Sequence, residues 1–76
     1  METGFCNDRS WLGVNIAYYR KARKLNQMEL AERVDISRTH MAAIEVGMKT
    51  PSLHVVYNIA DELGIPMVKL FEEREP

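Results

Sequence analysis

The segment from residue 37 to residue 43 carries side chains that could recognise the edges of base pairs. Arg38 has a planar guanidinium that can donate two hydrogen bonds to O6 and N7 of a guanine, or contact a phosphate instead. Thr39 could hydrogen-bond a base or touch a thymine methyl group, and His40 adds another polar side chain. No serine or cysteine partner is placed by a motif beside His40, and no acid is placed to orient it, so we do not expect His40 to act as a catalytic base.

A helix must position these side chains on one face. Met41 and Ile44 lie at helical spacing, and if both face the core they turn Thr39, Ala42 and Ala43 outward. The two alanines can offer only apolar contact. A solvated helix face normally carries Glu and Lys, so this small, uncharged face favours close approach to a partner such as the DNA major groove. Alanine is also the best helix former and needs no partner to explain it, so both interpretations remain open.

The residues from 27 to 46 predict two short helices joined by a tight turn, and the second of them, residues 38–46, is the expected recognition helix. Asn26 and Ser37 are the N-cap candidates of the two helices. The turn leaves few residues in which to reverse the chain, and we expect Asp35 to adopt the left-handed conformation there. The first helix has one buried stripe, formed by Leu30, Ala31 and Val34.

Three further helices are predicted around this pair. A first helix from about Arg9 to Lys24 has apolar residues at 12, 16 and 19, and a fourth follows Ser52 and ends before Gly64. Pro66 is placed as the first residue of a fifth. The expected core residues of the fourth helix are Leu53, Val56, Ile59, Ala60 and Leu63. The sequence therefore predicts an all-α, five-helix bundle over residues 9–73, with a flexible segment at 1–8 and a solvated tail at 74–76.

Charge is unevenly distributed along the 76 residues. The formal net charge is -1, which lacks the overall basic balance typical of nucleic-acid binders. Between Arg9 and Lys49, however, eight basic side chains stand against four acidic ones, whereas from Thr50 onward five acidic side chains stand against two basic ones. A basic middle with acidic ends can bind DNA on one side, because salt confines each patch to roughly 10 Å.

Several classes of site are not supported by the sequence. The single cysteine, Cys6, cannot form an internal disulfide, and this suits a reducing compartment, so we expect a cytoplasmic protein. No stretch approaches the roughly 20 apolar residues of a membrane span. No phosphate loop, metal cluster or nucleophile motif is evident, so we expect no enzyme activity, no catalytic residue, no cofactor, no metal and no small-molecule ligand.

A set of residues at fixed spacing resembles the phage repressor and Cro type helix-turn-helix family, also known as the xenobiotic-response-element type of DNA-binding domain. The resemblance runs from about Leu12 to Phe71. Asp35 stands where this family usually has glycine. The matching positions are Gln27, Leu30, Ala31, Val34, Ile36, Met41, Ile44, Glu45 and Gly47, with Leu12, Gly13, Ile16, Arg20, Lys21, Pro51, Ser52, Leu53, Leu63, Gly64 and Ile65 around them.

The resemblance implies a lambda repressor-like fold and sequence-specific binding of double-stranded DNA by a transcriptional regulator. We expect a homodimer on a palindromic operator, since dimers of this fold place two recognition helices about 34 Å apart. The alternative is a protein-interaction or antitoxin-type module built on the same helical scaffold. Phage repressors, restriction-modification controller proteins and antitoxins all share the pattern, and the sequence does not choose among them.

Site residues follow from the chemistry of the side chains together with the resemblance. The expected base contacts are Arg38, Thr39, His40, Ala42 and Ala43. The expected phosphate contacts are Asn26, Gln27, Ser37, Lys49, Thr50, Lys21 and Arg23. Gln27 could instead only cap its own helix, and Lys21 and Arg23 could instead only complement a helix dipole. Arg20 and Glu45 are expected to form an ion pair between the first and third helices. The expected dimer surface is Tyr57, Leu63, Val68 and Phe71.

Overall fold

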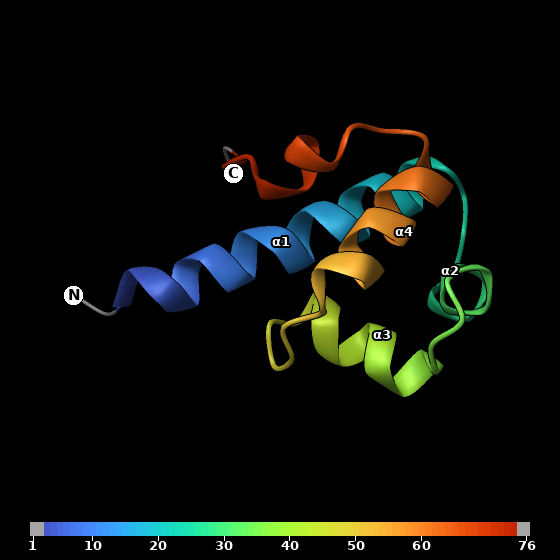
Figure 1. The fold of residues 1–76 in the computed structure, drawn as a ribbon, viewed down its shortest axis with the longest axis horizontal. Coiled ribbons are helices and arrows are strands. Elements are labelled where there is room, and N and C mark those ends of the chain that lie inside the picture. Colours follow the sequence, from blue (N-terminus) through green and yellow to red (C-terminus); the bar gives the residue numbers. More distant parts are fainter. Residues whose placement is uncertain (1–2, 75–76) are drawn as a thin grey trace.

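The chain folds into helices alone over the part that the computed structural model describes, which is the backbone of residues 3–74 and the side chains of residues 11–74. These helices are α1 (Thr3–Ala22), α2 (Gln27–Arg33), α3 (Arg38–Glu45), α4 (Leu53–Leu63) and a final 3-10 helix, η1 (Met67–Phe71) (Figure 1). The predicted all-α class with five helical elements is confirmed. Among the described residues, no helix has the length and apolar character needed to cross a membrane.

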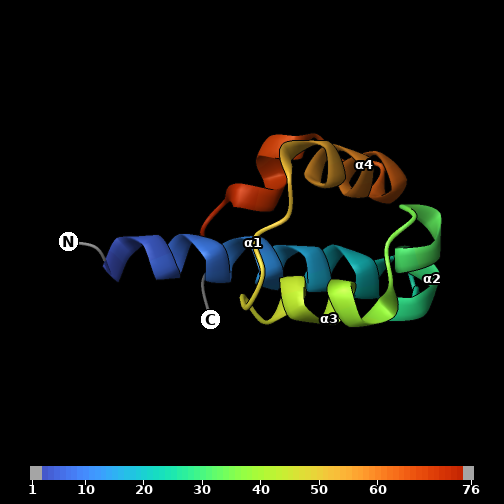
Figure 2. The same cartoon turned by 60° about the horizontal axis from the view of Figure 1, so that its bottom comes forward.

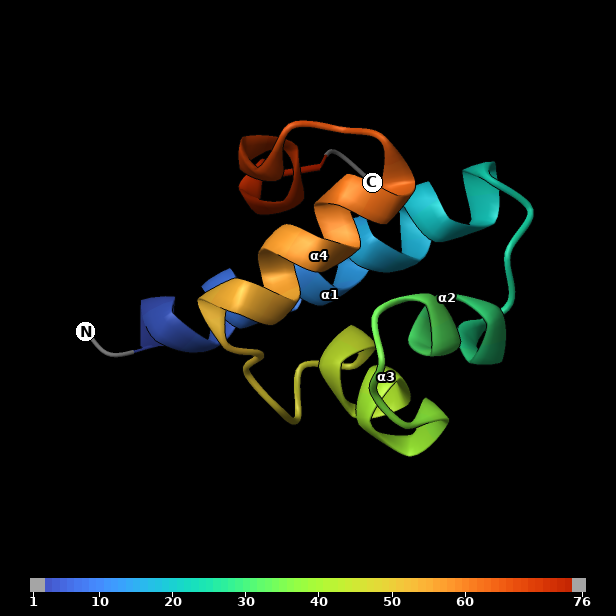
Figure 3. The same ribbon diagram turned by 45° about the vertical axis from the view of Figure 1, so that its right-hand side comes forward.

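The long helix α1 is the centre of the arrangement. It lies between α3 on one side and α4 with η1 on the other (Figure 2). The short helices α2 and α3 pack against each other at one end of the molecule, joined by a tight turn (Figure 3). All five elements contribute to one core, whose buried apolar residues are Leu12, Ile16, Leu30, Ala31, Val34, Met41, Ile44, Val56, Ile59, Ala60, Leu63 and Leu70.

The two ends of the chain differ from the sequence-based expectations. Helix α1 begins at Thr3 rather than about Arg9, so the backbone of residues 3–8 continues this helix instead of forming a separate segment. That residues 1–8 are flexible stays a prediction, and the side chain of Cys6 lies outside the described residues. The fifth element is a 3-10 helix, and Pro66 precedes it in an extended conformation (φ -65, ψ 142) instead of serving as its first residue.

Each of the four α-helices ends in the same way, at a residue in the left-handed conformation. The φ angles are 61° at Lys24, 61° at Asp35, 84° at Gly47 and 71° at Gly64. In every case the next residue donates its N–H to a carbonyl five positions back, which satisfies one of the free carbonyls at a helix end. These bonds are Leu25 to Arg20 (3.1 Å), Ile36 to Ala31 (3.0 Å), Met48 to Ala43 (2.9 Å) and Ile65 to Ala60 (3.1 Å).

Helices α1 and α3 touch backbone to backbone at Gly13. A Cβ atom placed on this residue would lie 2.6 Å from the carbonyl oxygen of Ile44, and the carbonyl of Glu45 is also too close to admit it. Glycine inside a helix costs about 1 kcal/mol relative to alanine. Only glycine permits this approach, so Gly13 sets how closely α3 packs on α1.

A buried amide fixes the C-terminal segment to α1. Asn15 is fully buried, and its Nδ2 donates to the carbonyls of Leu70 (2.9 Å) and Glu72 (2.7 Å) while its Oδ1 accepts from Arg74 Nε (2.6 Å). The Arg74 guanidinium also lies 3.7 Å from the ring centre of Tyr18 and donates to Tyr19 Oη at 3.2 Å. Arg74 is therefore not part of a solvated tail. Of the expected tail, residues 75 and 76 lie outside the described residues.

Candidate nucleic-acid interface

The start of α3 is fixed by its own cap. Ser37 has extended backbone angles (φ -75, ψ 158), and its Oγ accepts from the His40 N–H at 3.0 Å. Helix α2 is capped by Asn26, whose side chain accepts from the Glu29 N–H while the Glu29 carboxylate accepts from the Asn26 N–H, both at 2.8 Å. The two caps each satisfy a free N–H group at a helix start, and the bonds between Asn26 and Glu29 are reciprocal. The Ser37 cap holds the α3 end of the turn between α2 and α3, and the bond from the Ile36 N–H to the Ala31 carbonyl holds its α2 end, with Asp35 left-handed as expected.

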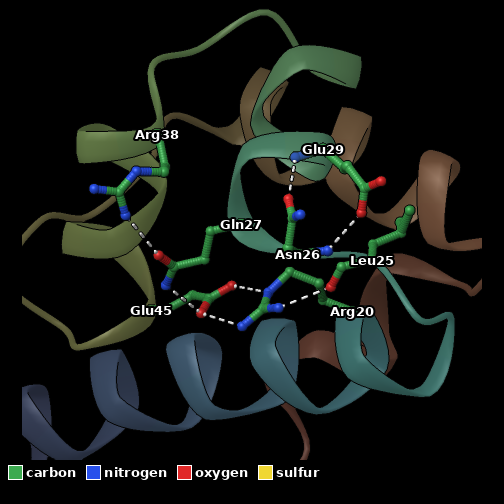
Figure 4. A network of polar contacts seen from close by, with 7 residues as sticks. All are labelled: Arg20, Leu25, Asn26, Gln27, Glu29, Arg38 and Glu45. Atoms are coloured by element: carbon green, nitrogen blue, oxygen red, sulfur yellow. Dashed lines mark hydrogen bonds and ion pairs between the residues drawn. The ribbon is translucent and has the colours of Figure 1, made fainter.

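Arg20 and Glu45 join α1 to α3 by a two-pronged ion pair. Arg20 Nε donates to Glu45 Oε2 at 2.7 Å and Nη2 donates to Oε1 at 3.0 Å, with only 10% and 6% of the two side chains exposed. Arg20 Nη1 also donates to the Leu25 carbonyl at 2.8 Å (Figure 4). The parallel bonds fix direction as well as distance. The ion pair therefore sets the angle at which α3 leaves the body of the molecule.

Gln27 extends this network to the exposed start of α3. Its Nε2 donates to Glu45 Oε1 at 2.9 Å, and its Oε1 lies 3.5 Å from Arg38 Nη1 (Figure 4). A separation of 3.5 Å is at the outer limit of a hydrogen bond, so the contact with Arg38 is weak. Gln27 thus links the buried ion pair to an exposed guanidinium, and this bridging role was not predicted from the sequence. The half-buried amide keeps one N–H available for a phosphate.

The outward face of α3 carries the expected base-contact residues. Met41 and Ile44 are buried, Arg38 and Thr39 are exposed, and the remaining three, His40, Ala42 and Ala43, are half-buried. The core therefore does not cover the face that the sequence analysis turned outward. This surface carries one cation, a hydroxyl group, an imidazole and small apolar side chains. It can therefore donate hydrogen bonds and approach a groove closely.

One residue of this face was missed. Val46, the C-cap of α3, is 68% exposed. Its spacing from Thr39 is seven residues, which is close to two helical turns, so the two side chains point to nearly the same side. Sequence periodicity could have found it, but an apolar residue at a helix end is more often counted with the core.

Cationic and hydroxyl groups flank α3, although not every predicted phosphate contact belongs with them. Ser37 lies before the helix, and Lys49 and Thr50 follow it in an exposed turn. Arg23 does not join them, because its guanidinium lies beside Gly64 at the end of α4, on the opposite side of α1 from α3. We therefore remove Arg23 from the expected phosphate contacts. Lys21 is exposed in the last turn of α1.

The predicted dimer surface needs one correction. Leu63 is fully buried in the core of its own protomer, so it cannot contact a partner. Tyr57, Val68 and Phe71 are each more than half exposed. Leu53, which the sequence analysis assigned to the core, is also exposed and lies one turn before Tyr57 on α4. The exposed apolar side chains of α4 and η1 thus number four among the described residues.

Comparison with known proteins gives consistent matches. A family model described as helix-turn-helix matches residues 16–70. The immunity repressor protein of Bacillus phage phi105 is 39% identical over 62 residues, which cover 82% of this chain and 43% of that repressor, so the match spans less than half of that relative's length. An HTH-type transcriptional regulator of Methanocaldococcus jannaschii is 36% identical over 56 residues, covering 74% of this chain and 85% of that protein.

Among solved structures, the restriction-modification controller protein C.AhdI from Aeromonas hydrophila superposes with a TM-score of 0.81 at 28% identity. The superposition covers 86% of this chain and 98% of the controller protein. A hypothetical transcription factor from Neisseria gives a TM-score of 0.81 at 26% identity, covering 84% of this chain and 72% of that chain. The shared fold therefore includes the helix-turn-helix and the helices around it.

Proposed function

The chain belongs to the helix-turn-helix family of the phage repressor and Cro type, and from this membership we propose that it is a cytoplasmic, homodimeric regulator of transcription that binds a palindromic operator. The observation that carries the proposal is the exposed face of α3. Its opposite face is tied to the core by Met41 and Ile44 and to α1 by the Arg20–Glu45 pair, so the outward face is held rigidly clear of the body.

Recognition of bases would begin at the first turn of α3. Arg38 can leave its weak contact with Gln27 and form two hydrogen bonds to a guanine. Thr39 and His40 can each add a hydrogen bond, and Ala42 and Ala43 permit the helix to approach the groove closely. Phosphates would be held by the residues on either side of the helix, which are Asn26, Gln27, Ser37, Lys49, Thr50 and Lys21.

Dimerisation would use the exposed apolar side chains of α4 and η1, which are Leu53, Tyr57, Val68 and Phe71. Burying them against a second copy removes apolar surface from water. A two-fold interface of this kind presents the same patch on both protomers. Two copies of α3 would then read two half-sites about one turn of DNA, roughly 34 Å, apart, and the operator would be a palindrome.

Selection of bound sequences from random duplex DNA tests this proposal. We expect a two-fold symmetric site whose half-sites are centred about 10–10.5 base pairs apart. The affinity for that site should fall steeply between about 50 and 200 mM salt, because each neutralised phosphate contributes about 0.9 to the slope of log K against log salt. A chain that enriches no sequence, or whose partner is a protein bound equally well at both salt concentrations, would support the protein-interaction alternative instead.

A further inference from the structure

Val46 is the one large apolar side chain on the outward face of α3, among the described residues. It lies two helical turns beyond Thr39 on nearly the same side, with Ala42 and Ala43 between them. At 68% exposed it contributes little to the core, so burial within the protomer does not account for a valine here.

The backbone holds Val46 in a fixed place. Its N–H donates to the Ala42 carbonyl at 3.2 Å, and the chain then reverses through Gly47, whose φ is 84° and whose N–H donates to the Ile44 carbonyl at 3.1 Å. The Met48 N–H closes the turn on the Ala43 carbonyl at 2.9 Å. Valine is branched at Cβ and therefore has few side-chain conformations to lose on contact. The two methyl groups are presented at the end of α3 with little freedom.

Charges at both ends of α3 indicate which partner covers this side chain. Arg38 precedes and Lys49 follows the face that carries Val46, and both are exposed. Two cations so placed suit DNA, since Arg38 can donate to a guanine edge and Lys49 can contact a phosphate beside the groove. Among the chemical groups at the edge of base pairs in the major groove, the 5-methyl group of thymine is the apolar group that projects furthest toward a bound side chain.

We infer that Val46 is a specificity-determining residue that packs against the 5-methyl group of a thymine in each half-site. The inference rests on the proposed function and names part of its target sequence. Seven residues of helix rise by about 10.5 Å, and base pairs are spaced about 3.4 Å apart along the DNA axis. Because the groove is inclined to that axis, the thymine lies within about three base pairs of the pair that Thr39 contacts.

The competing role for Val46 is contact with a deoxyribose, which would strengthen binding without favouring any base. The two roles depend on different groups of the DNA, the 5-methyl group of thymine in one case and the deoxyribose in the other. Replacing a thymine by deoxyuridine removes the 5-methyl group and leaves the sugar, the phosphate and the hydrogen-bonding edges unchanged. The test therefore measures the affinity of the wild-type chain and of Val46→Ala for the selected duplex, with each half-site thymine replaced in turn.

We expect one thymine, within about three base pairs of the Thr39 position, at which the replacement weakens wild-type binding by about fourfold, the ratio that follows from burying one methyl group. In Val46→Ala the same replacement should change the affinity by less than about twofold. Met48→Ala serves as the matched control, because Met48 is 80% exposed and lies only two residues further along. It should retain the full fourfold response.

Two results would overturn the inference while leaving the proposed function intact. One is a selected half-site without thymine at the facing position. The other is an equal loss in Val46→Ala for thymine and deoxyuridine duplexes, which would identify a deoxyribose contact. Failure to bind any duplex at low salt would instead overturn the proposed function, and this inference with it.

Discussion

On the proposed function, Arg38 is the side chain on which base selectivity would depend most. It is exposed at the start of α3, and its only described polar partner, Gln27, is 3.5 Å away, so little is lost when the guanidinium turns to DNA. Arg38→Ala should weaken binding to the selected site by about 1–3 kcal/mol and relax the preference at one base position. Binding titrations on the selected site and on its single-base variants measure both effects.

Arg33→Ala is the matched control, because Arg33 is also exposed but lies on α2, 3.8 Å from Glu62 of α4. It should leave the base preference unchanged. If Arg38→Ala lowered the affinity for all variants by the same factor, Arg38 would be a phosphate contact and not a base contact.

Asp35 occupies a backbone conformation that glycine adopts without steric cost. Its φ of 61° ends α2, and glycine is found at the equivalent ends of α3 and α4. Asp35→Gly should raise the free energy of unfolding by up to about 1 kcal/mol, which corresponds to about 4–8 °C in Tm for a domain of this size. Thermal unfolding followed by circular dichroism checks it.

The control for this substitution is Asp61→Gly, at an exposed position inside α4. It should lower the stability by roughly the helix-propensity difference, since glycine is costly in a helix interior. A loss of stability in Asp35→Gly as well would mean that the aspartate stabilises the turn by more than its backbone strain costs.

At the level of single residues, the sequence predicts conformations that are tied to a motif. Asp35 was identified because the turn between two short helices leaves only a few positions for a left-handed residue. Lys24 adopts the same conformation, but nothing in its side chain signals this. Asn15 gave no signal either, since the two carbonyls that it binds lie 55 and 57 residues further along the chain.

The relation between α1 and α3 depends on the Arg20–Glu45 pair. Both side chains are almost entirely buried, so removing one partner leaves an uncompensated charge, which typically costs about 3–5 kcal/mol. Arg20→Met and Glu45→Leu should each destabilise the fold by an amount of this order, whereas the double variant should be much less destabilised than the sum. Thermal melts of the wild type and the three variants provide a double-mutant cycle. Additive losses of stability in the two single variants would contradict energetic coupling of the pair.

Whole elements were predicted best where apolar residues recur at helical spacing. This holds for α2, α3 and α4, and for α1 from Leu12 onward. The start of α1 was placed too late because residues 3–8 show no apolar periodicity. The conformation of η1 depends on long-range contacts that helical spacing does not reveal. Leu70 is buried, and the carbonyls of Leu70 and Glu72 accept hydrogen bonds from Asn15.

The surfaces proposed for DNA binding and for dimerisation lie on different parts of the molecule. The outward face of α3 and the apolar side chains of α4 and η1 belong to elements on opposite sides of α1 (Figure 2). One surface can therefore bind DNA while the other binds a second copy, and a substitution on one need not damage the other. Helical periodicity alone does not predict this separation, because it does not say on which side of α1 each helix packs.

Phe71→Asp tests the surface proposed for the dimer. Phe71 is 52% exposed, and a carboxylate there would have to be desolvated in an apolar interface. Sedimentation should show a shift toward monomer, and affinity for a full palindrome should fall at least tenfold while affinity for an isolated half-site is unchanged. Val14→Asp, at an exposed apolar position on α1, should leave both measurements unaltered. An unchanged oligomeric state in Phe71→Asp would exclude this surface.

Gly13 has no side chain, and this determines how the orientation of α3 relative to α1 can change. Since the two main chains meet there without any intervening atom, even one added carbon acts as a wedge between them. The molecule could accommodate it only by swinging α3 away, which would also stretch the salt link formed by Arg20. On the proposed function, a substitution at Gly13 would therefore change stability and base preference together.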